Sequence, residues 1–193
     1  MRNLLIVTII GPALASGCHS QNKVILDSEP ITVEQASVYQ SFVHQFAMPL
    51  QLKRIANRTI PFDFTGFPEG RPCLTGIDLE ETSKAEHSSH PLTDDVGNQA
   101  NLKVVEIKEL AQSSGWLSLN SAIKQPSAEK NEPTLNTIVL SEIVFDKHHR
   151  FAIIKYFLVC GEHCLSGATF VMQKVDDKWT FSDRRPCAMF VGE

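Results

Sequence analysis

The sequence predicts an α+β domain in which an N-terminal amphipathic helix packs on a C-terminal antiparallel β-meander of about four to five strands. Two observations predict this class. Apolar residues recur at helical spacing between Thr32 and Pro49, and residues 137–191 contain runs of alternating apolar and polar residues separated by short polar turns. Helical periodicity early and strand periodicity late favour a helix laid against a sheet.

The helix has a start signal and a stop signal as well as a period. Thr32 is followed three residues later by Gln35, the spacing of a capping box, and Pro49 ends the pattern. The residues that recur at helical spacing are Val33, Ala36, Tyr39, Val43 and Phe46, with Phe42 beside them. We therefore expect a helix from about Thr32 to Pro49.

The middle of the chain has weaker patterns. Leu50–Ala56 partly alternates and predicts a first strand, and Leu102–Val105 predicts a short one. Thr82–Asp95 has almost no apolar residues, so we expect a mobile loop there. Glu106–Gln112 is expected to form one or two helical turns.

The C-terminal region carries the clearest strand pattern. The predicted strands are Thr137–Phe145, Phe151–Cys160, Ala168–Val175, Lys178–Ser182 and Ala188–Val191. Short polar segments join them, among them Asp146–Arg150 and the pair Asp176-Asp177, a residue type that favours tight turns. Connections this short predict antiparallel hairpins.

Residues 1–17 are typical of a secretory signal peptide, with Arg2, a short apolar run and then small residues. The apolar run is shorter than the roughly 20 residues that cross a bilayer. Leu14-Ala-Ser-Gly-Cys18 resembles a bacterial lipobox, although Ala15 stands where Leu is usual. Cys18 is therefore predicted to be lipidated. The alternatives are cleavage after Ala15, which leaves Cys18 as a stray thiol, and a buried N-terminal strand.

This leader divides the chain into a signal peptide at 1–17, a lipidated N-terminus and tether at 18–29, and one α+β domain at 30–193. His19 rather than Asp follows the cysteine, which by the sorting habit of enterobacterial lipoproteins favours the outer membrane. We expect a protein of the bacterial cell envelope, lipid-anchored and facing the periplasm.

Five cysteines are present, Cys18, Cys73, Cys160, Cys164 and Cys187. If Cys18 carries lipid, four remain, which is enough for two disulfides in an oxidising compartment. Four cysteines allow three pairings. We favour Cys160–Cys164 together with Cys73–Cys187.

Cys160, His163 and Cys164 lie at the tip of a predicted hairpin and are the strongest candidates for chemistry. A small disulfide loop that pins the hairpin is favoured, because it suits the compartment. One alternative is a thiol redox pair in which His163 favours a thiolate. Another is a copper or zinc site built from the two thiolates and the imidazole.

The remaining histidines and charged residues give weaker evidence for a functional site than Cys160, His163 and Cys164. His87 and His90, with Asp94 and Asp95, could reach one metal ion, but in a flexible loop we expect surface histidines. His148-His149 is expected on a solvated turn, and the isolated pair Arg184-Arg185 on a solvated surface. The net charge of −4 becomes −5 without Arg2, and no basic cluster with interleaved aromatics predicts nucleic-acid binding.

Five segments of the C-terminal half form a recognisable pattern: Ser141-Glu-Ile-Val-Phe-Asp146, Ala152-Ile-Ile-Lys-Tyr156, Cys160-Gly…Cys164…Gly167, Phe170-Val-Met-Gln-Lys174 and Lys178-Trp179. This pattern resembles that of a group of uncharacterised bacterial exported proteins and lipoproteins. It covers roughly residues 105–182, with weaker agreement at Tyr39 and Thr59. The resemblance implies an antiparallel meander and an exported protein, and it implies no activity. Glu162-His163 departs from the small or apolar residues of the group.

No hydrolase motif or nucleotide-binding motif is present in the sequence, and no cofactor is expected. We expect a non-enzymatic module that contacts the membrane through its N-terminal lipid and either binds an envelope protein or a small ligand or serves a structural role. The alternative is a thiol redox or copper- or zinc-handling protein that uses Cys160, His163 and Cys164.

Overall fold

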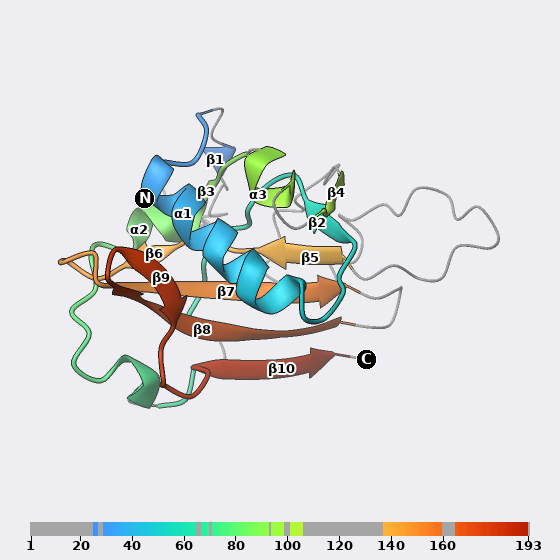
Figure 1. Ribbon diagram of the computed structural model, residues 1–193. Helices are drawn as coiled ribbons and strands as arrows, with labels where there is room; N and C mark the ends of the chain where they lie inside the picture. The colour runs from blue at the N-terminus through green and yellow to red at the C-terminus, as the bar shows by residue number, and fades with distance from the viewer. Residues whose placement is uncertain are drawn as a thin grey trace, which may run out of the picture.

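The computed structural model describes residues 25–26, 29–64, 67–69, 71–92, 94–98, 101–105, 137–159 and 165–192. One long helix and a mostly antiparallel sheet dominate this part of the chain, which confirms the α+β class (Figure 1). Among the described residues, no helix is long and apolar enough to span a membrane. The predicted signal peptide, Cys18 and residues 106–136 lie outside the described residues.

The elements follow one another along the chain as a helix, short irregular elements and then a run of strands. The helices are α1 (Val33–Phe42), α2 (Ser83–His87) and α3 (Asp94–Asn98), with a π-helix at Val43–Ala47 and a 3₁₀ turn at Pro72–Leu74. The strands are β1 (Ile25–Leu26), β2 (Arg54–Ala56), β3 (Ser88–Ser89), β4 (Lys103–Val105), β5 (Thr137–Leu140), β6 (Val144–Phe145), β7 (Phe151–Val159), β8 (Leu165–Val175), β9 (Lys178–Phe181) and β10 (Ala188–Gly192).

The main sheet has the strand order β10-β8-β7-β5-β2-β4. In addition, β6 pairs with β7, and β9 pairs with β8. Every pair within the C-terminal region is antiparallel, as the alternating runs predict. The turn between β8 and β9 uses Asp176 and Asp177, both with positive φ (48° and 59°), the conformation that a two-residue hairpin turn requires. β2 differs, because it pairs in parallel with both β4 and β5 and so inserts the first half of the chain into the sheet.

The capping box at the start of α1 is present. The Thr32 hydroxyl accepts a hydrogen bond from the Gln35 N–H, and the Gln35 side chain accepts one from the Thr32 N–H. The π-helix that follows α1 ends just before Pro49. Val33 is 89 % exposed, contrary to its expected place on the apolar face. At about 100° per residue, Val33 lies about 180° around the helix from Phe42, which is fully buried.

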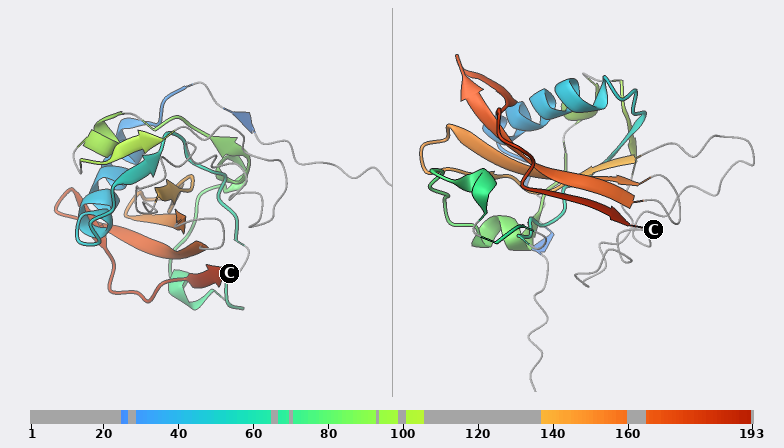
Figure 2. Two further views of the ribbon diagram at one scale, coloured as in Figure 1. Left: turned by 90° about the vertical axis from the view of Figure 1, so that its right-hand side faces the viewer. Right: turned by 90° about the horizontal axis from the view of Figure 1, so that it is seen from below.

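Each face of the sheet contributes to a separate core. On one face the Phe42 ring lies 5.8 Å from the Tyr156 ring and 5.6 Å from the Phe181 ring, beneath α1. On the other face, Ile153 and Val171 pack with Phe62 and the Pro72–Leu74 turn. Figure 2 shows α1 on one side of the sheet and this turn on the other. The alternation of side chains along β7 and β8 produces both cores.

Thr82–Asp95 is not the mobile loop that its composition suggests. It forms α2, β3 and the start of α3, and Ser88, Ser89 and His90 are buried. Its backbone is fixed by residues distant in sequence: the Phe62 N–H donates to the Ala85 carbonyl at 2.8 Å, and the Leu92 N–H donates to the Asn57 carbonyl at 2.8 Å. A polar segment can therefore be ordered when a distant segment satisfies its backbone groups.

Candidate functional site

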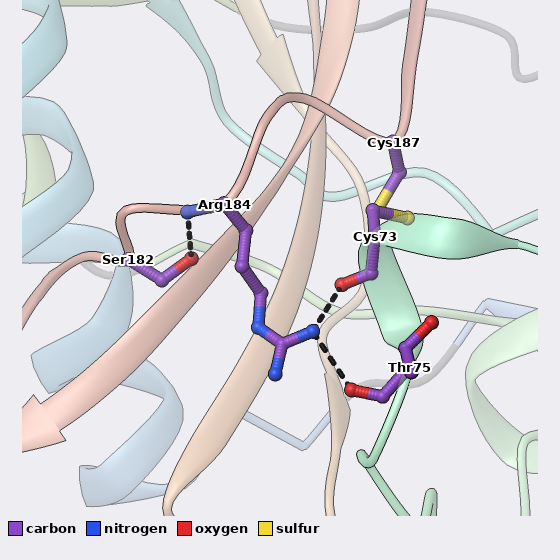
Figure 3. Close-up of a disulfide and its surroundings, with 5 residues drawn as sticks. All are labelled: Cys73, Thr75, Ser182, Arg184 and Cys187. Carbon is purple, nitrogen blue, oxygen red and sulfur yellow. Dashed lines mark hydrogen bonds between the residues drawn. A yellow bond between two sulfur atoms is a disulfide. The ribbon is translucent and has the colours of Figure 1, made fainter.

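A disulfide joins Cys73, in the 3₁₀ turn, to Cys187, which directly precedes β10 (Figure 3). The two Cα atoms lie 5.1 Å apart, and the two residues are 114 positions apart in the sequence. Both are buried in the core on the face opposite α1. The structure thus contains one of the two disulfides that the cysteine count favours.

Arg184 lies beside this disulfide and holds two carbonyls of the 3₁₀ turn (Figure 3). Its Nη1 donates to the carbonyl of Cys73 at 3.0 Å and to the carbonyl of Thr75 at 2.9 Å. Its guanidinium carbon lies 5.5 Å from the centre of the Phe151 ring. Arg185 is exposed, as expected for a solvated surface, whereas Arg184 is half-buried by these contacts.

The other predicted site residues lie outside the described residues. These are Cys18, the predicted lipid attachment point, and the hairpin-tip residues Cys160, His163 and Cys164. The Cys160–Cys164 disulfide, the redox pair and the copper or zinc site therefore stay predictions.

His87 and His90 are the two histidines that a metal site in the 87–95 segment would use. His90 is buried rather than on the surface, and its Nδ1 lies 3.0 Å from Glu142 Oε1. Within the described part of the chain, no three His, Cys, Asp or Glu side chains are placed to hold a metal ion together. His87, His90 and Asp95 are thus not brought together as a metal site, and the Asp94 side chain lies outside what the structure describes.

A buried polar cluster surrounds the Glu142 carboxylate; we call Tyr39, Thr59, His90, Ser141 and Glu142 the Glu142 cluster. Glu142 Oε1 accepts hydrogen bonds from the Thr59 hydroxyl and from the His90 N–H, the latter at 3.0 Å. The His90 N–H also lies 2.8 Å from the Thr59 hydroxyl oxygen. All five residues are at most 6 % exposed. A buried carboxylate is tolerated only when such partners surround it.

Tyr39 connects this cluster to α1. Its hydroxyl donates to the Ser141 carbonyl at 2.7 Å, and the residue is fully buried. Burial raises the pKa of the Tyr39 hydroxyl well above its ordinary value, and the negative charge of Glu142 raises it further. The phenol therefore stays protonated and acts as a hydrogen-bond donor that fixes the helix on the sheet.

His149 forms a second charged cluster at the surface, where a solvated turn residue is expected. Its Nδ1 lies 2.7 Å from Glu34 of α1, and its Nε2 lies 2.8 Å from Glu80. Its ring stacks on Phe145 at 4.8 Å between centroids. The hydrogen bond to Glu34 is the main cause that raises the pKa of His149, burial opposes it, and Glu80 adds to the rise. We call Glu34, Glu80 and His149 the His149 clasp.

Lys155 is a buried amine in the middle of β7. Its Nζ donates to the Asp63 carbonyl at 2.7 Å and lies 3.5 Å from the Asp63 carboxylate and 5.6 Å from the Phe62 ring centre. Burial lowers the pKa of Lys155, although Asp63 raises it in part. A buried lysine with a lowered pKa can serve as a base, but these contacts attach the Asp63 segment to the sheet.

Sequence patterns did not indicate the Glu142 cluster, the clasp or Lys155. Glu142 and Lys155 lie inside apolar runs, where a single charged residue is a weak signal of burial. A charged residue within a strand that is otherwise apolar on both faces is the one signal that could have found them.

Comparison with known proteins adds no relative, since no protein-family model, no curated protein and no solved structure matches this chain.

Proposed function

We propose that this chain is a lipoprotein of the bacterial envelope whose α+β domain is a non-enzymatic binding or structural module. In this proposal residues 1–17 are removed, lipid on Cys18 anchors the protein in the outer membrane, and residues 18–29 tether the domain. The resemblance of residues 105–182 to exported proteins and lipoproteins supports the same location. We expect an envelope protein as partner.

The Cys73–Cys187 disulfide is the observation that carries this proposal. Disulfides form and persist in oxidising compartments and are rare in the cytosol, where thiols are kept reduced. This one is buried in the core and connects residues 114 positions apart. A crosslink inside the core supports a chain that folds outside the cytoplasm.

The pairing of the titratable groups supports a non-enzymatic role. A general acid or base must reach a proton of the substrate. Glu142 is instead enclosed with Thr59 and His90, and Lys155 holds Asp63. These groups hold segments of the protein together.

The anchor is tested by metabolic labelling with a radioactive fatty acid in a bacterial host. The wild-type protein should be labelled, and Cys18→Ser should abolish the label. Cys187→Ser is the matched control, because it removes a different cysteine and should keep the label. Equal labelling of Cys18→Ser and the wild type would show that Cys18 is not the site of lipid attachment.

The non-enzymatic role is tested by counting free thiols and bound metal in protein purified without reductant. We expect neither, since two disulfides use the four remaining cysteines. A bound copper or zinc ion that is lost in Cys164→Ser would support metal handling through Cys160, His163 and Cys164. A bond at Cys160–Cys164 that a mild dithiol reduces readily would support a redox role instead.

A further inference from the structure

We propose that an extended acidic segment of a partner protein pairs with the outer edge of β10 and places its carboxylates on Arg71, Arg184 and Arg185. This inference rests on the proposed binding role and names the chemistry of the partner. Its basis is three arginines that form no ion pair with a carboxylate of the described residues, in the two segments that the Cys73–Cys187 disulfide joins, and the edge strand β10 that follows Cys187.

The three arginines lie in the two segments that the disulfide joins. Arg71 directly precedes the 3₁₀ turn that holds Cys73, and Arg184 and Arg185 precede Cys187. Across the described residues, none of the three arginines forms an ion pair with a carboxylate. Two lysines elsewhere in the described chain do form ion pairs, Lys147 with Asp78 and Lys174 with Glu34. The positive charge here is therefore available to a partner.

Arg184 is held in a fixed orientation with one side of its guanidinium open. Both hydrogens of Nη1 are used by the carbonyls of Cys73 and Thr75. No group of the described chain accepts a hydrogen bond from Nε or Nη2, so these two donors are left for an added acceptor. The Nε–Nη2 side is one of the edges with which arginine binds a planar carboxylate through two parallel hydrogen bonds.

Arg71 is also held in place, by aromatic rings. Its guanidinium carbon lies 4.3 Å from the centre of the Phe64 ring and 5.9 Å from that of Phe67. Its backbone is left-handed, with φ of 43°, a conformation that non-glycine residues rarely adopt and that clusters at functional sites. The stacked guanidinium is exposed, so little conformational entropy is lost when an anion binds it.

β10 supplies an edge for a peptide to pair with. It is the last strand of the sheet and, in the part of the chain that is described, pairs with β8 alone. Its Met189 side chain is 77 % exposed. A sheet edge whose main-chain groups are unpaired is a template for an added strand, in which main-chain hydrogen bonds give affinity and side-chain contacts, here with Met189, give specificity.

The position of β10 favours a protein partner over the anchoring membrane. β1, where the described chain begins, lies at the opposite end of the molecule from β10 in Figure 1 and in the left view of Figure 2. A domain held at the membrane through its N-terminal end therefore presents β10 away from the lipid surface.

Two exposed carboxylates near the arginines provide a test by gain of binding. Glu69 and Asp183 lie in the same two segments, and neither forms an ion pair with the arginines. Each repels an acidic peptide. Asp183→Asn should therefore tighten binding, an effect that a misfolded protein would not show.

The experiment measures binding of a labelled peptide that alternates Glu with Thr to the full mature protein in mild detergent. We expect saturable binding that Arg185→Glu weakens by about tenfold, that Arg184→Lys weakens less, and that Asp183→Asn strengthens. Lys103→Glu is the matched control, because it makes the same charge change on β4, at the opposite edge of the sheet. It should change binding little.

Several results would overturn the inference. These are equal binding of a Gln–Thr peptide, an equal loss in Lys103→Glu, or unchanged binding of a peptide whose backbone is N-methylated along one edge. Stronger arginine-dependent binding to phosphatidylglycerol vesicles would assign the surface to anionic lipid instead. Fatty-acid labelling at Cys18 is a separate readout. A protein that is labelled but does not bind the peptide would contradict this inference and would still support the lipid anchor.

Discussion

His90 and His149 both lie against glutamate side chains, but in regions that differ in their contact with water. His90 and Glu142 are 6 % and 2 % exposed, whereas the side chains of His149 and Glu80 are 41 % and 43 % exposed. Each cluster joins the irregular first half of the chain to the C-terminal meander. The comparison teaches that the same pair of residue types can be essential for stability inside the core and nearly dispensable at the surface.

Loss of the buried carboxylate should have the largest effect. Glu142→Ala removes the acceptor that the Thr59 hydroxyl and the His90 N–H share in a region closed to water. We expect the free energy of unfolding to fall by about 1–3 kcal/mol, the usual cost when buried donors lose their acceptor. Urea denaturation measures it, provided that the m value is unchanged.

The matched variant at the surface is Glu80→Ala, which removes a carboxylate from His149. Its cost should stay below about 1 kcal/mol, because water and Glu34 still solvate the imidazole. Equal losses for Glu142→Ala and Glu80→Ala would show that burial does not set the difference between the two clusters.

The two tyrosines of the chain, Tyr39 and Tyr156, provide a second test of how much a buried polar contact contributes to stability. Tyr39→Phe removes a buried hydrogen bond to the Ser141 carbonyl and should cost about 0.5–1.5 kcal/mol. Tyr156 forms no hydrogen bond through its hydroxyl with any described residue, so Tyr156→Phe is the control and should cost almost nothing. A larger loss for Tyr156→Phe than for Tyr39→Phe would contradict the hydrogen-bond assignment.

Absorbance titration gives an independent measure of the same pair. Burial raises the pKa of both phenols, and for Tyr39 the charge of Glu142 raises it further. In the Tyr156→Phe protein, the remaining phenol should ionise only as the protein unfolds at high pH. Reversible ionisation of Tyr39 in the folded protein would contradict its burial.

The sequence predicts the C-terminal hairpins well, because each depends on residues that are close together in the chain. The alternating runs indicate β7, β8, β9 and β10, and Asp176-Asp177 indicates the turn between β8 and β9. The capping box of Thr32 and Gln35 is equally local and is also present.

The sequence does not predict features that depend on distant partners. β2 pairs in parallel with both β4 and β5, and Glu142 meets Thr59 and His90 from 83 and 52 residues away. No local pattern records such distances. Thr82–Asp95 looks like a loop for the same reason, since the groups that satisfy its backbone belong to residues 57–62.

The presence of disulfides could be predicted by counting cysteines, but the pairing and its surroundings could not. The count of five cysteines and the leader sequence leave three pairings of four cysteines open, and Cys73–Cys187 belongs to the pairing that we favour. The role of Arg184 depends on two carbonyls more than a hundred residues earlier in the chain. From the sequence alone, Arg184 is therefore interpreted as an ordinary surface cation.

The smallest expected effect is the pH dependence of the His149 clasp. Hydrogen bonding to Glu34 raises the pKa of His149 above its ordinary 6.5, so its contribution is complete below that value and is lost as the pH rises through the folded-state pKa. For Glu34, burial raises the pKa, but hydrogen bonds from His149 and Lys174 outweigh it and lower the pKa below its ordinary 4.5. Its contribution is therefore lost as the pH falls through that lowered pKa.

The clasp should consequently stabilise the protein most between about pH 4.5 and 6.5. His149→Gln should lower the free energy of unfolding by about 0.5–1 kcal/mol at pH 6 and by less at pH 8, because the clasp is exposed and screened. Denaturation at the two pH values measures this difference, and added salt should reduce it. The Glu142→Ala loss should keep its size in salt, because water does not reach that carboxylate. If salt reduced both losses equally, the two glutamates would share one environment and the contrast between core and surface would fail.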